Sequence, residues 1–166
     1  MWAVPSGVGE NSGMNELSQL VEEGVGPLEE GGLALQWIET IGHSVHKVPT
    51  YFFRMVDPLT KVEFGTINLR IGRSAHIERY AGHIGYSVVP EHRGHHYAAR
   101  ATKLLMPLAR SLGFHVLWIT CDPENIASRR SCEAAGAILQ EIVDVPVTCT
   151  IHRHGHPKKC RYQLSL

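Results

Sequence analysis

The stretch that decides the fold runs from Gly82 to Gly136. It opens with Gly82-His-Ile-Gly-Tyr-Ser-Val-Val-Pro-Glu-His-Arg-Gly-His-His-Tyr-Ala-Ala-Arg100 and closes with Cys121-Asp-Pro-Glu-Asn-Ile-Ala-Ser-Arg-Arg-Ser-Cys-Glu-Ala-Ala-Gly136. Apolar residues alternate with small ones from Ile84 to Val88, which predicts a strand. Pro90 ends this strand because proline has no N–H to donate. The stretch therefore predicts a strand that leads directly into a turn.

A long helix with one buried face is expected after that turn. Its apolar residues recur at the three-and-four spacing of such a helix, and they are Tyr97, Ala101, Leu104, Leu105, Leu108 and Leu112. Gly113 supplies the stop. The first turn of a helix presents unpaired backbone N–H groups and the positive end of the helix dipole, so an anion site is predicted there. Arg93 and its neighbours His92, His95 and His96 add donors, and phosphate is the expected anion.

A buried strand and a short helix complete the stretch. Residues 114–121 form a nearly continuous apolar run of strand length, which is typical of a strand covered on both faces. Asn125 fits the N-cap of the next helix without any ligand. The predicted order is therefore strand, anion-binding turn, long helix, buried strand and capped short helix.

Composition limits the classes of partner. Sixteen Lys and Arg residues balance sixteen Asp and Glu residues, and 43% of the chain is hydrophobic, so neither nucleic acid nor a membrane is an expected partner. There is no apolar run of about 18 residues and no signal-peptide pattern, so a cytoplasmic protein with reduced cysteines is predicted. Residues 1–32 read as a flexible leader with one short helix at 15–23, and residues 33–166 read as a single domain.

The turn and its helix resemble a motif of the GNAT superfamily of acyl-CoA N-acyltransferases. In that family Arg/Gln-x-x-Gly-x-Gly/Ala cradles the pyrophosphate of coenzyme A, and here the six residues are Arg93-Gly94-His95-His96-Tyr97-Ala98. The first and last positions match, whereas His96 stands where the family usually has glycine. Because glycine tolerates unusual backbone dihedrals, His96 implies either ordinary helical geometry or a shifted phosphate.

A second motif lies downstream. Asn125, Ser128, Glu133 and Gly136 resemble the Asn-x-x-Ser-x-x-x-x-Glu-x-x-Gly pattern of the branch that includes the ribosomal-protein N-terminal acetyltransferases. In the family this Asn also reaches the pantetheine arm. Other branches carry, seven residues later, a tyrosine that reprotonates the leaving thiolate, and here that residue is Cys132. Simple packing is the alternative role for a small buried thiol.

The resemblance implies an α+β fold of the α/β three-layer type. A mixed, mostly antiparallel sheet of about six to seven strands is expected, flanked by helices, with a splayed central parallel pair that forms the cofactor cleft. The remaining strands are predicted at 33–41, 49–56, 62–71, 138–145 and 160–164. The family has two helices between its first two strands, and residues 42–48 leave no room for them. That side of the acceptor groove is therefore expected to be open or filled by a second copy in a homodimer.

Amide formation from a thioester requires an oxyanion donor and a base. The family resemblance implies that a backbone N–H near Val88 or Val89 stabilises the oxyanion. His83 and Glu91 are the candidate bases, because His83 lies where many relatives carry a glutamate and an imidazole with a pKa near about 6.5 suits proton removal at neutral pH. The alternatives are a strand histidine bonded to the backbone for His83 and a simple turn residue for Glu91.

The resulting hypothesis is a bacterial N-acetyltransferase that transfers acetyl from acetyl-CoA to a primary amine of a small molecule or peptide, by direct attack in a ternary complex. The predicted catalytic residues are His83, Glu91 and Cys132. The predicted cofactor-binding residues are Val88, Val89, Arg93, Gly94, His95, His96, Tyr97, Ala98, Asn125 and Ser128.

Two alternatives stay open. One is a non-catalytic acyl-CoA-binding module, suggested by His96 and by the absence of the family tyrosine. The other is a metal- or partner-binding protein that uses the run 149–160, which holds two cysteines and three histidines. The spacing of this run matches no standard zinc finger, and no metal ligands are assigned. Its basic residues are instead candidates for contact with a phosphate or an acidic acceptor.

Overall fold

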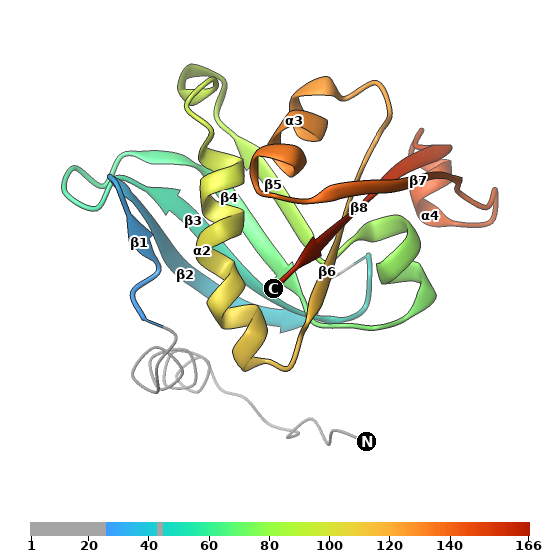
Figure 1. Ribbon diagram of the computed structural model, residues 1–166, viewed down its shortest axis with the longest axis horizontal. Helices are drawn as coiled ribbons and strands as arrows, with labels where there is room; N and C mark the ends of the chain where they lie inside the picture. The colour runs from blue at the N-terminus through green and yellow to red at the C-terminus, as the bar shows by residue number, and fades with distance from the viewer. Residues whose placement is uncertain (1–25, 43–44) are drawn as a thin grey trace.

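The computed structural model describes residues 26–42 and 45–166, so the expected helix at 15–23 lies outside the described residues. Within them, the strands form two antiparallel sheets, a five-stranded sheet in the order β1-β2-β3-β4-β5 and a three-stranded sheet in the order β6-β8-β7 (Figure 1). The strands are β1 (Glu29–Glu30), β2 (Leu33–Gly42), β3 (Pro49–Val56), β4 (Glu63–Arg70), β5 (Ile84–Val88), β6 (Val116–Cys121), β7 (Ile138–Asp144) and β8 (Lys158–Ser165).

Helices join and cover these sheets. They are η2 (Ile77–Ala81), η3 (Pro90–His92), α2 (Tyr97–Ser111), α3 (Ile126–Ala134) and α4 (Thr150–Arg153). The apolar spacing predicted α2 correctly, and its buried stripe includes Ala101, Leu105 and Leu108. The segments that hold η2 and α4 read as loops in the sequence, because these helices are short and have little apolar periodicity. In the described part of the chain, no helix has the length and apolarity needed to cross a membrane.

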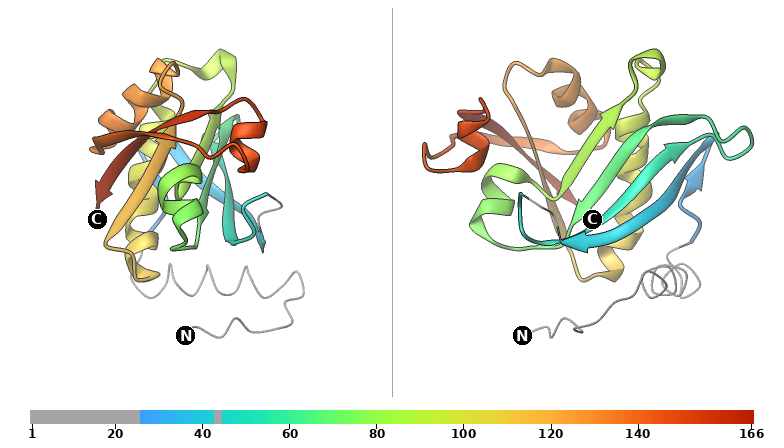
Figure 2. Two further views of the ribbon diagram at one scale, coloured as in Figure 1. Left: turned by 90° about the vertical axis from the view of Figure 1, so that its right-hand side faces the viewer. Right: turned by 180° about the vertical axis from the view of Figure 1, so that it is seen from behind.

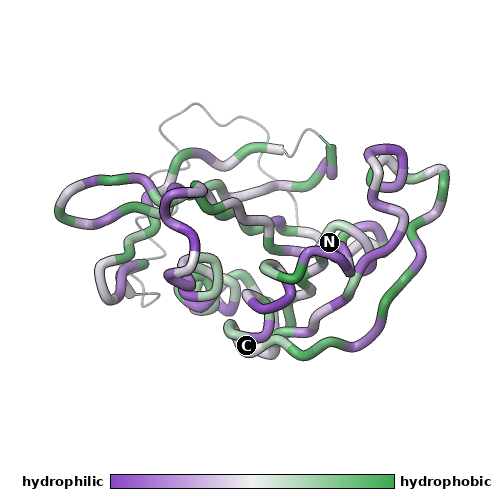
Figure 3. The backbone as a smooth tube through the Cα atoms, turned by 90° about the horizontal axis from the view of Figure 1, so that it is seen from above, coloured by the Kyte–Doolittle hydropathy of each residue, from purple (hydrophilic) through white to green (hydrophobic). Residues whose placement is uncertain are grey.

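The five-stranded sheet has one covered face and one open face. Helix α2 lies across the first face (Figure 2), where Phe53 and Met55 of β3 are fully buried. Phe52 is half-buried and Arg54 is exposed, so burial alternates over residues 52–55 of the strand. Hydrophobic and hydrophilic residues are interspersed along the chain (Figure 3). No described helix covers the second face, and the described residues 45–48 before β3 contain none. This agrees with the expected reduction of the N-terminal helices.

The first sheet begins earlier in the chain than Leu33. Strand β1 pairs with β2 through Glu30 and Leu33. Leu28 is 9% exposed and belongs to the core, and its carbonyl accepts a 2.8 Å hydrogen bond from the N–H of Leu35. The described end of the predicted leader is therefore part of the folded domain.

The expected central pair corresponds to β5 and β6, where one sheet is divided into two. The N–H of His83, just before β5, donates to the carbonyl of Trp118 in β6 at 2.6 Å. The N–H of Trp118 in turn donates to the ring Nδ1 of His83 at 2.8 Å. Gly82 allows this close approach, because a Cβ there would lie 2.9 Å from the N of Thr120. Beyond this junction the strands part.

Candidate active site

A cavity of about 410 Å³ opens between β5 and β6 beyond the junction of His83 and Trp118, and we call it the β5–β6 cavity. Its volume is in the range of small-molecule sites. Both sheets line it, together with the connection before β3, the end of η2, the start of α3, α4 and the loop after α4. The lining residues are Val45, His46, Arg70, Tyr80, Ala81, Ile84, Gly85, Tyr86, Ile119, Thr120, Cys121, Asp122, Asn125, Ser128, Ile151, His154, His156 and Lys159.

The turn before α2 has the backbone geometry of a glycine-rich loop despite His96. His96 is the N-cap of α2 and has φ 59° and ψ 24°, the left-handed region that glycine favours. Gly94 also has a positive φ, of 87°. Neither alternative that the sequence suggested, helical geometry at His96 or a shifted phosphate, is needed, because the histidine adopts the conformation of the glycine it replaces.

The donors of this turn fit a pyrophosphate. The first-turn N–H groups of a helix lack intrahelical acceptors, and here they belong to Tyr97, Ala98 and Ala99, since the N–H of Arg100 already donates to the carbonyl of His96. Arg93 is exposed, and its Nε donates to the carbonyl of Val88 at 3.1 Å. Within the described residues its two terminal nitrogens form no hydrogen bond, so the guanidinium is anchored at one side and open at the other. Exposed His95 and Gly94 complete the turn.

Val88 and Val89 differ as oxyanion donors. The N–H of Val89 donates to the carbonyl of Phe64 at 2.9 Å, so it is not available to a ligand. Hydrogen bonds alternate in direction along an antiparallel strand, which turns the N–H of Val88 away from β4 and toward the gap beside β6. The oxyanion role therefore stays a prediction for Val88, and Val89 is no longer a candidate.

The predicted base His83 has no free ring nitrogen. Its Nε2 bonds the carbonyl of Gly72 at 2.9 Å, and its Nδ1 accepts from Trp118. Burial, with smaller contributions from Arg73 and Arg70, lowers the pKa of the ring to about 4. The ring is 1% exposed, neutral and bonded to backbone groups through both nitrogens. It therefore has no nitrogen available to take a proton from a substrate, and these contacts agree with the alternative of a strand histidine bonded to the backbone. Glu91 is exposed in η3 and does not line the cavity.

Asn125 and Ser128 lie at the start of α3, at the edge of the cavity. The side-chain Oδ1 of Asn125 accepts from the N–H of Ser128 at 3.1 Å, which is the predicted N-cap. Both residues also line the cavity. The cap therefore holds the second motif beside the gap between β5 and β6.

Comparison with known proteins agrees with this geometry. Residues 24–138, more than half of the chain, match the family model described as "Acetyltransferase (GNAT) domain". The chain belongs to the GNAT acetyltransferase family. No curated protein sequence matches it.

Solved GNAT structures share the fold. A GNAT acetyltransferase from Bacillus anthracis is 20% identical with a TM-score of 0.55, over 69% of this chain and 65% of that one. The ribosomal-protein-S5-alanine acetyltransferase from Vibrio fischeri is 17% identical, with a TM-score of 0.55, over 70% and 61%. The Microcin C7 self-immunity acetyltransferase, in complex with acetyl-CoA and AMP, is 15% identical, with a TM-score of 0.54, over 70% and 61%. This chain thus spans less than two thirds of each.

A tyrosine from another element lies beside the position where other GNAT branches carry theirs. The hydroxyl of Tyr86, in β5, lies 2.8 Å from the Oγ of Ser128 and 3.6 Å from the Sγ of Cys132. Cys132 is 1% exposed and does not line the cavity, whereas Tyr86 and Cys121 do. A hydrogen bond with Cys121 lowers the pKa of the Cys132 thiol against the opposing effect of burial. Burial raises the pKa of Tyr86, so its hydroxyl stays protonated.

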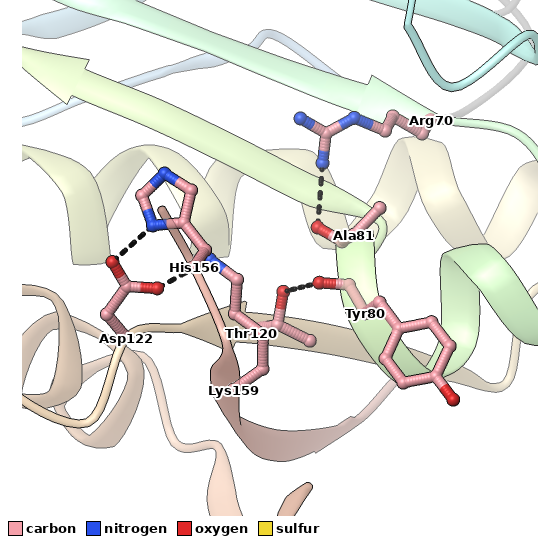
Figure 4. A network of polar contacts seen from close by, with 7 residues as sticks. All are labelled: Arg70, Tyr80, Ala81, Thr120, Asp122, His156 and Lys159. Carbon is pink, nitrogen blue, oxygen red and sulfur yellow. Dashed lines mark hydrogen bonds and ion pairs between the residues drawn. The ribbon is translucent and has the colours of Figure 1, made fainter. Parts of the chain in front are cut away.

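A polar network that also lines the cavity was not among the catalytic residues predicted from the sequence. Asp122 directly follows β6, and it accepts from Nδ1 of His156 at 2.6 Å and from Nζ of Lys159 at 2.8 Å (Figure 4). Burial alone would raise the pKa of this carboxyl, but the hydrogen bonds from Lys159 and His156 lower it below its ordinary value. The histidine-rich run gave a sequence signal, but nothing in it pointed to Asp122 as the partner.

Arg70 adds positive charge to the same cavity. It is 8% exposed, and its Nη1 donates to the carbonyls of Ala81 and Gly82 at 3.1 and 3.0 Å. Burial lowers its pKa to about 10, so it remains charged at neutral pH. Among the described residues Arg70 forms no ion pair. Because the charges of Asp122 and Lys159 cancel, Arg70 leaves the cavity lining with a net positive charge.

The histidine and cysteine side chains near α4 do not converge on a metal site. His46 Nδ1 lies 2.9 Å from one nitrogen of His76, and Cys149 Sγ lies 3.8 Å from the other. The two nitrogens of one imidazole point in different directions, so these groups form a chain. In the part of the chain that the structure describes, no group of three or more His, Cys, Asp or Glu side chains is arranged to hold a metal ion.

Proposed function

We propose that the protein transfers an acetyl group from acetyl-CoA to a primary amine, by direct attack while both substrates are bound. The observation that carries this proposal is the relation of two sites. The turn at Arg93–Ala98 follows β5 and offers donors for the pyrophosphate, and the β5–β6 cavity beside the same strand offers space for the acyl group and the acceptor. Acetyl-CoA would supply the activated acyl group, and the chain supplies orientation, donors and proton acceptors.

Four parts of the chain have distinct tasks in this proposal. Arg93 and the first-turn N–H groups of α2 bind the phosphates. The N–H of Val88 points into the gap and stabilises negative charge on the thioester oxygen. The hydroxyl of Tyr86, which donates to the carbonyl of Ser128 at 3.1 Å in the free protein, turns to donate a hydrogen bond to the leaving sulfur, and Cys132 supports this hydroxyl from the core side. Asn125 and Ser128 guide the pantetheine arm along the start of α3.

The acceptor is proposed to be the α-amine of a peptide or a small molecule. An α-amine has a solution pKa of about 8, whereas a lysine or polyamine amine has a pKa of about 10.4 and needs more help from a base. The solved relative from Vibrio fischeri is named for an alanine of ribosomal protein S5, and a peptide could lie along the sheet face that no described helix covers. An amine screen with both pKa classes separates these acceptors.

The experiment that tests the function is calorimetric titration with acetyl-CoA and with CoA, followed by the amine screen. The Arg93→Ala variant is expected to weaken binding about 10- to 100-fold, because a charge-assisted phosphate contact contributes about 1.5–3 kcal/mol. Arg110→Ala, at the opposite end of α2, is the matched control and should bind like the wild type. Equal affinity of both variants would contradict the phosphate turn.

A non-catalytic acyl-CoA-binding module is the second candidate, and the cysteine at the family's tyrosine position favours it. Binding of acetyl-CoA without turnover on any amine would establish that alternative. A homodimer stays a prediction, for which β7 offers exposed apolar residues, Ile138 and Ile142. Light scattering after size-exclusion chromatography measures the oligomeric state.

A further inference from the structure

The network around Asp122 has the layout of an oriented base. Asp122 is 28% exposed and holds two partners with its two carboxylate oxygens, the ring of His156 on Oδ2 and Lys159 on Oδ1. The Lys159 side chain is 13% exposed, so it is largely buried against this carboxylate. The ion pair keeps Asp122 ionised and fixed. A fixed carboxylate on one nitrogen of an imidazole sets the orientation and tautomer of the ring.

The second nitrogen of His156 is without a hydrogen bond among the described residues, and the residue lines the β5–β6 cavity. Because Nδ1 donates to the carboxylate, the neutral ring carries its lone pair on Nε2. Nε2 forms no hydrogen bond with any described residue, and His156 lines the β5–β6 cavity with a side chain that is 42% exposed. In Figure 4 the free edge of the ring points away from Asp122. His156 thus has the open nitrogen that His83 lacks.

The other charged groups around the cavity favour the neutral amine. Arg70 and Lys159 are cationic, and His46 and His154 also line the space. Positive neighbours disfavour an ammonium relative to a free amine, so they lower the pKa of a bound acceptor. Asp122 is the carboxylate in the lining, and it is already held by two donors. The surroundings therefore assist proton removal but do not accept the proton, which leaves that task to His156.

We propose that His156 is the general base of the reaction and that Asp122 is its positioning residue, an inference that rests on the proposed acetyl transfer. The acceptor ammonium gives one proton to Nε2, and the freed electron pair forms the new N–C bond. The C–S bond breaks with its electron pair on sulfur. The nitrogen loses a second proton, which neutralises the thiolate by way of solvent and the Tyr86 hydroxyl, while His156 returns the first proton to solvent.

The competing explanation is structural, because the same hydrogen bond ties the loop after α4 to the end of β6. A purely structural His156 would change activity equally at every pH. A base becomes unnecessary once the acceptor amine is deprotonated in solution, so the effect of removing it fades as the pH rises. The pH profile of kcat/KM distinguishes the two roles.

The experiment compares wild type, His156→Gln and Asp122→Asn over about pH 6 to 10 with an α-amine acceptor from the screen. Loss of the base is expected to reduce kcat/KM about 100-fold at neutral pH, with recovery toward the wild-type rate at high pH. Asp122→Asn is expected to lower kcat/KM at neutral pH by a smaller factor, since the imidazole loses the carboxylate that orients it. His152→Gln, on α4 and outside the cavity lining, is the control and should match the wild type.

Each outcome decides something different. A His156→Gln profile that is unchanged, or lowered equally at every pH, would overturn the base assignment and leave the acetyl transfer standing. Wild-type protein that binds acetyl-CoA but turns over no amine would overturn the enzyme itself, and the base with it. Ring-nitrogen NMR of the free protein gives a readout without turnover. It should show the Nδ1–H tautomer of His156, and loss of that preference in Asp122→Asn, whereas an Nε2–H tautomer would contradict the proposal.

Discussion

His83 and His156 lie at the closed and the open end of the same gap between β5 and β6, and their surroundings give them opposite roles. At the closed end, both nitrogens of His83 are bonded to backbone groups and the ring is 1% exposed. At the open end, one nitrogen of His156 is held by Asp122, the other is without a hydrogen bond among the described residues, and the residue lines the cavity. The number of free nitrogens, rather than the residue type, decides which histidine joins sheets and which can move protons.

The largest expected effect comes from removing the His83 side chain at the closed end of the gap. His83→Ala leaves the N–H of Trp118 and the carbonyl of Gly72 without their partner and creates a cavity, so the free energy of unfolding should fall by about 4 kcal/mol. His156→Ala breaks a half-exposed pair and should cost less than about 1 kcal/mol. Urea denaturation measures both. Equal losses of unfolding free energy would contradict the different structural roles of His83 and His156.

The next effect is the pH dependence of stability that His83 contributes. Its ordinary pKa is 6.5 and its folded pKa is about 4, so the unfolded chain binds more protons in this interval. The stability is therefore complete above about pH 7 and is lost as the pH falls from 6.5 toward 4, by about 3 kcal/mol. His83→Gln offers an acceptor to Trp118 and a donor to Gly72 without titrating. The acid-induced loss should be smaller by that amount in this variant, and identical losses would refute the assignment.

A third test concerns the leaving sulfur, on the side of the cavity away from His156. Tyr86→Phe removes the hydroxyl that lies between Ser128 and Cys132 and should lower kcat about 10- to 100-fold. Cys132→Ala, which removes support behind that hydroxyl, should lower kcat less. Steady-state kinetics with the screened amine measures both. A larger loss for Cys132→Ala would return the proton donor to the position that the sequence motif suggested.

The smallest expected effect concerns a third histidine, His96, whose backbone conformation affects stability. His96 has a left-handed conformation that disfavours residues with a Cβ. His96→Gly should therefore raise the free energy of unfolding by up to about 1 kcal/mol, whereas His96→Ala, which keeps a Cβ, should give no gain. Thermal unfolding resolves the two. Destabilisation by glycine would mean that the imidazole itself contributes contacts.

The sequence predicted the parts of the fold that depend on local patterns. The stripe of Leu105 and Leu108 predicted α2, the N-cap Asn125 predicted the start of α3, and the apolar run at 114–121 predicted β6. The short connection before β3 predicted the uncovered sheet face. These features depend on periodicity, capping and chain length, which are readable within one segment.

The sequence did not predict features that depend on partners far apart in the chain. His83 was expected to be a base because its bonds to Gly72 and Trp118 are invisible in a strand pattern. The pairing of Asp122 with His156 joins residues 34 positions apart. The hydroxyl of Tyr86 reaches Cys132 from 46 positions away. Catalytic roles arise from such contacts, and resemblance in a motif fixes only the positions inside that motif.

The junction between the two sheets also has a consequence for local opening. The amide proton of Trp118 is held by an imidazole nitrogen instead of a carbonyl, so protonation of that one side chain releases it. Each sheet keeps its own inter-strand hydrogen bonds when this occurs. The two sheets can therefore separate from each other as intact units, and acid favours this opening. In hydrogen-exchange measurements, the Trp118 amide would thus lose protection on acidification before its neighbours in β6, and it would report the separation of the two halves of the protein.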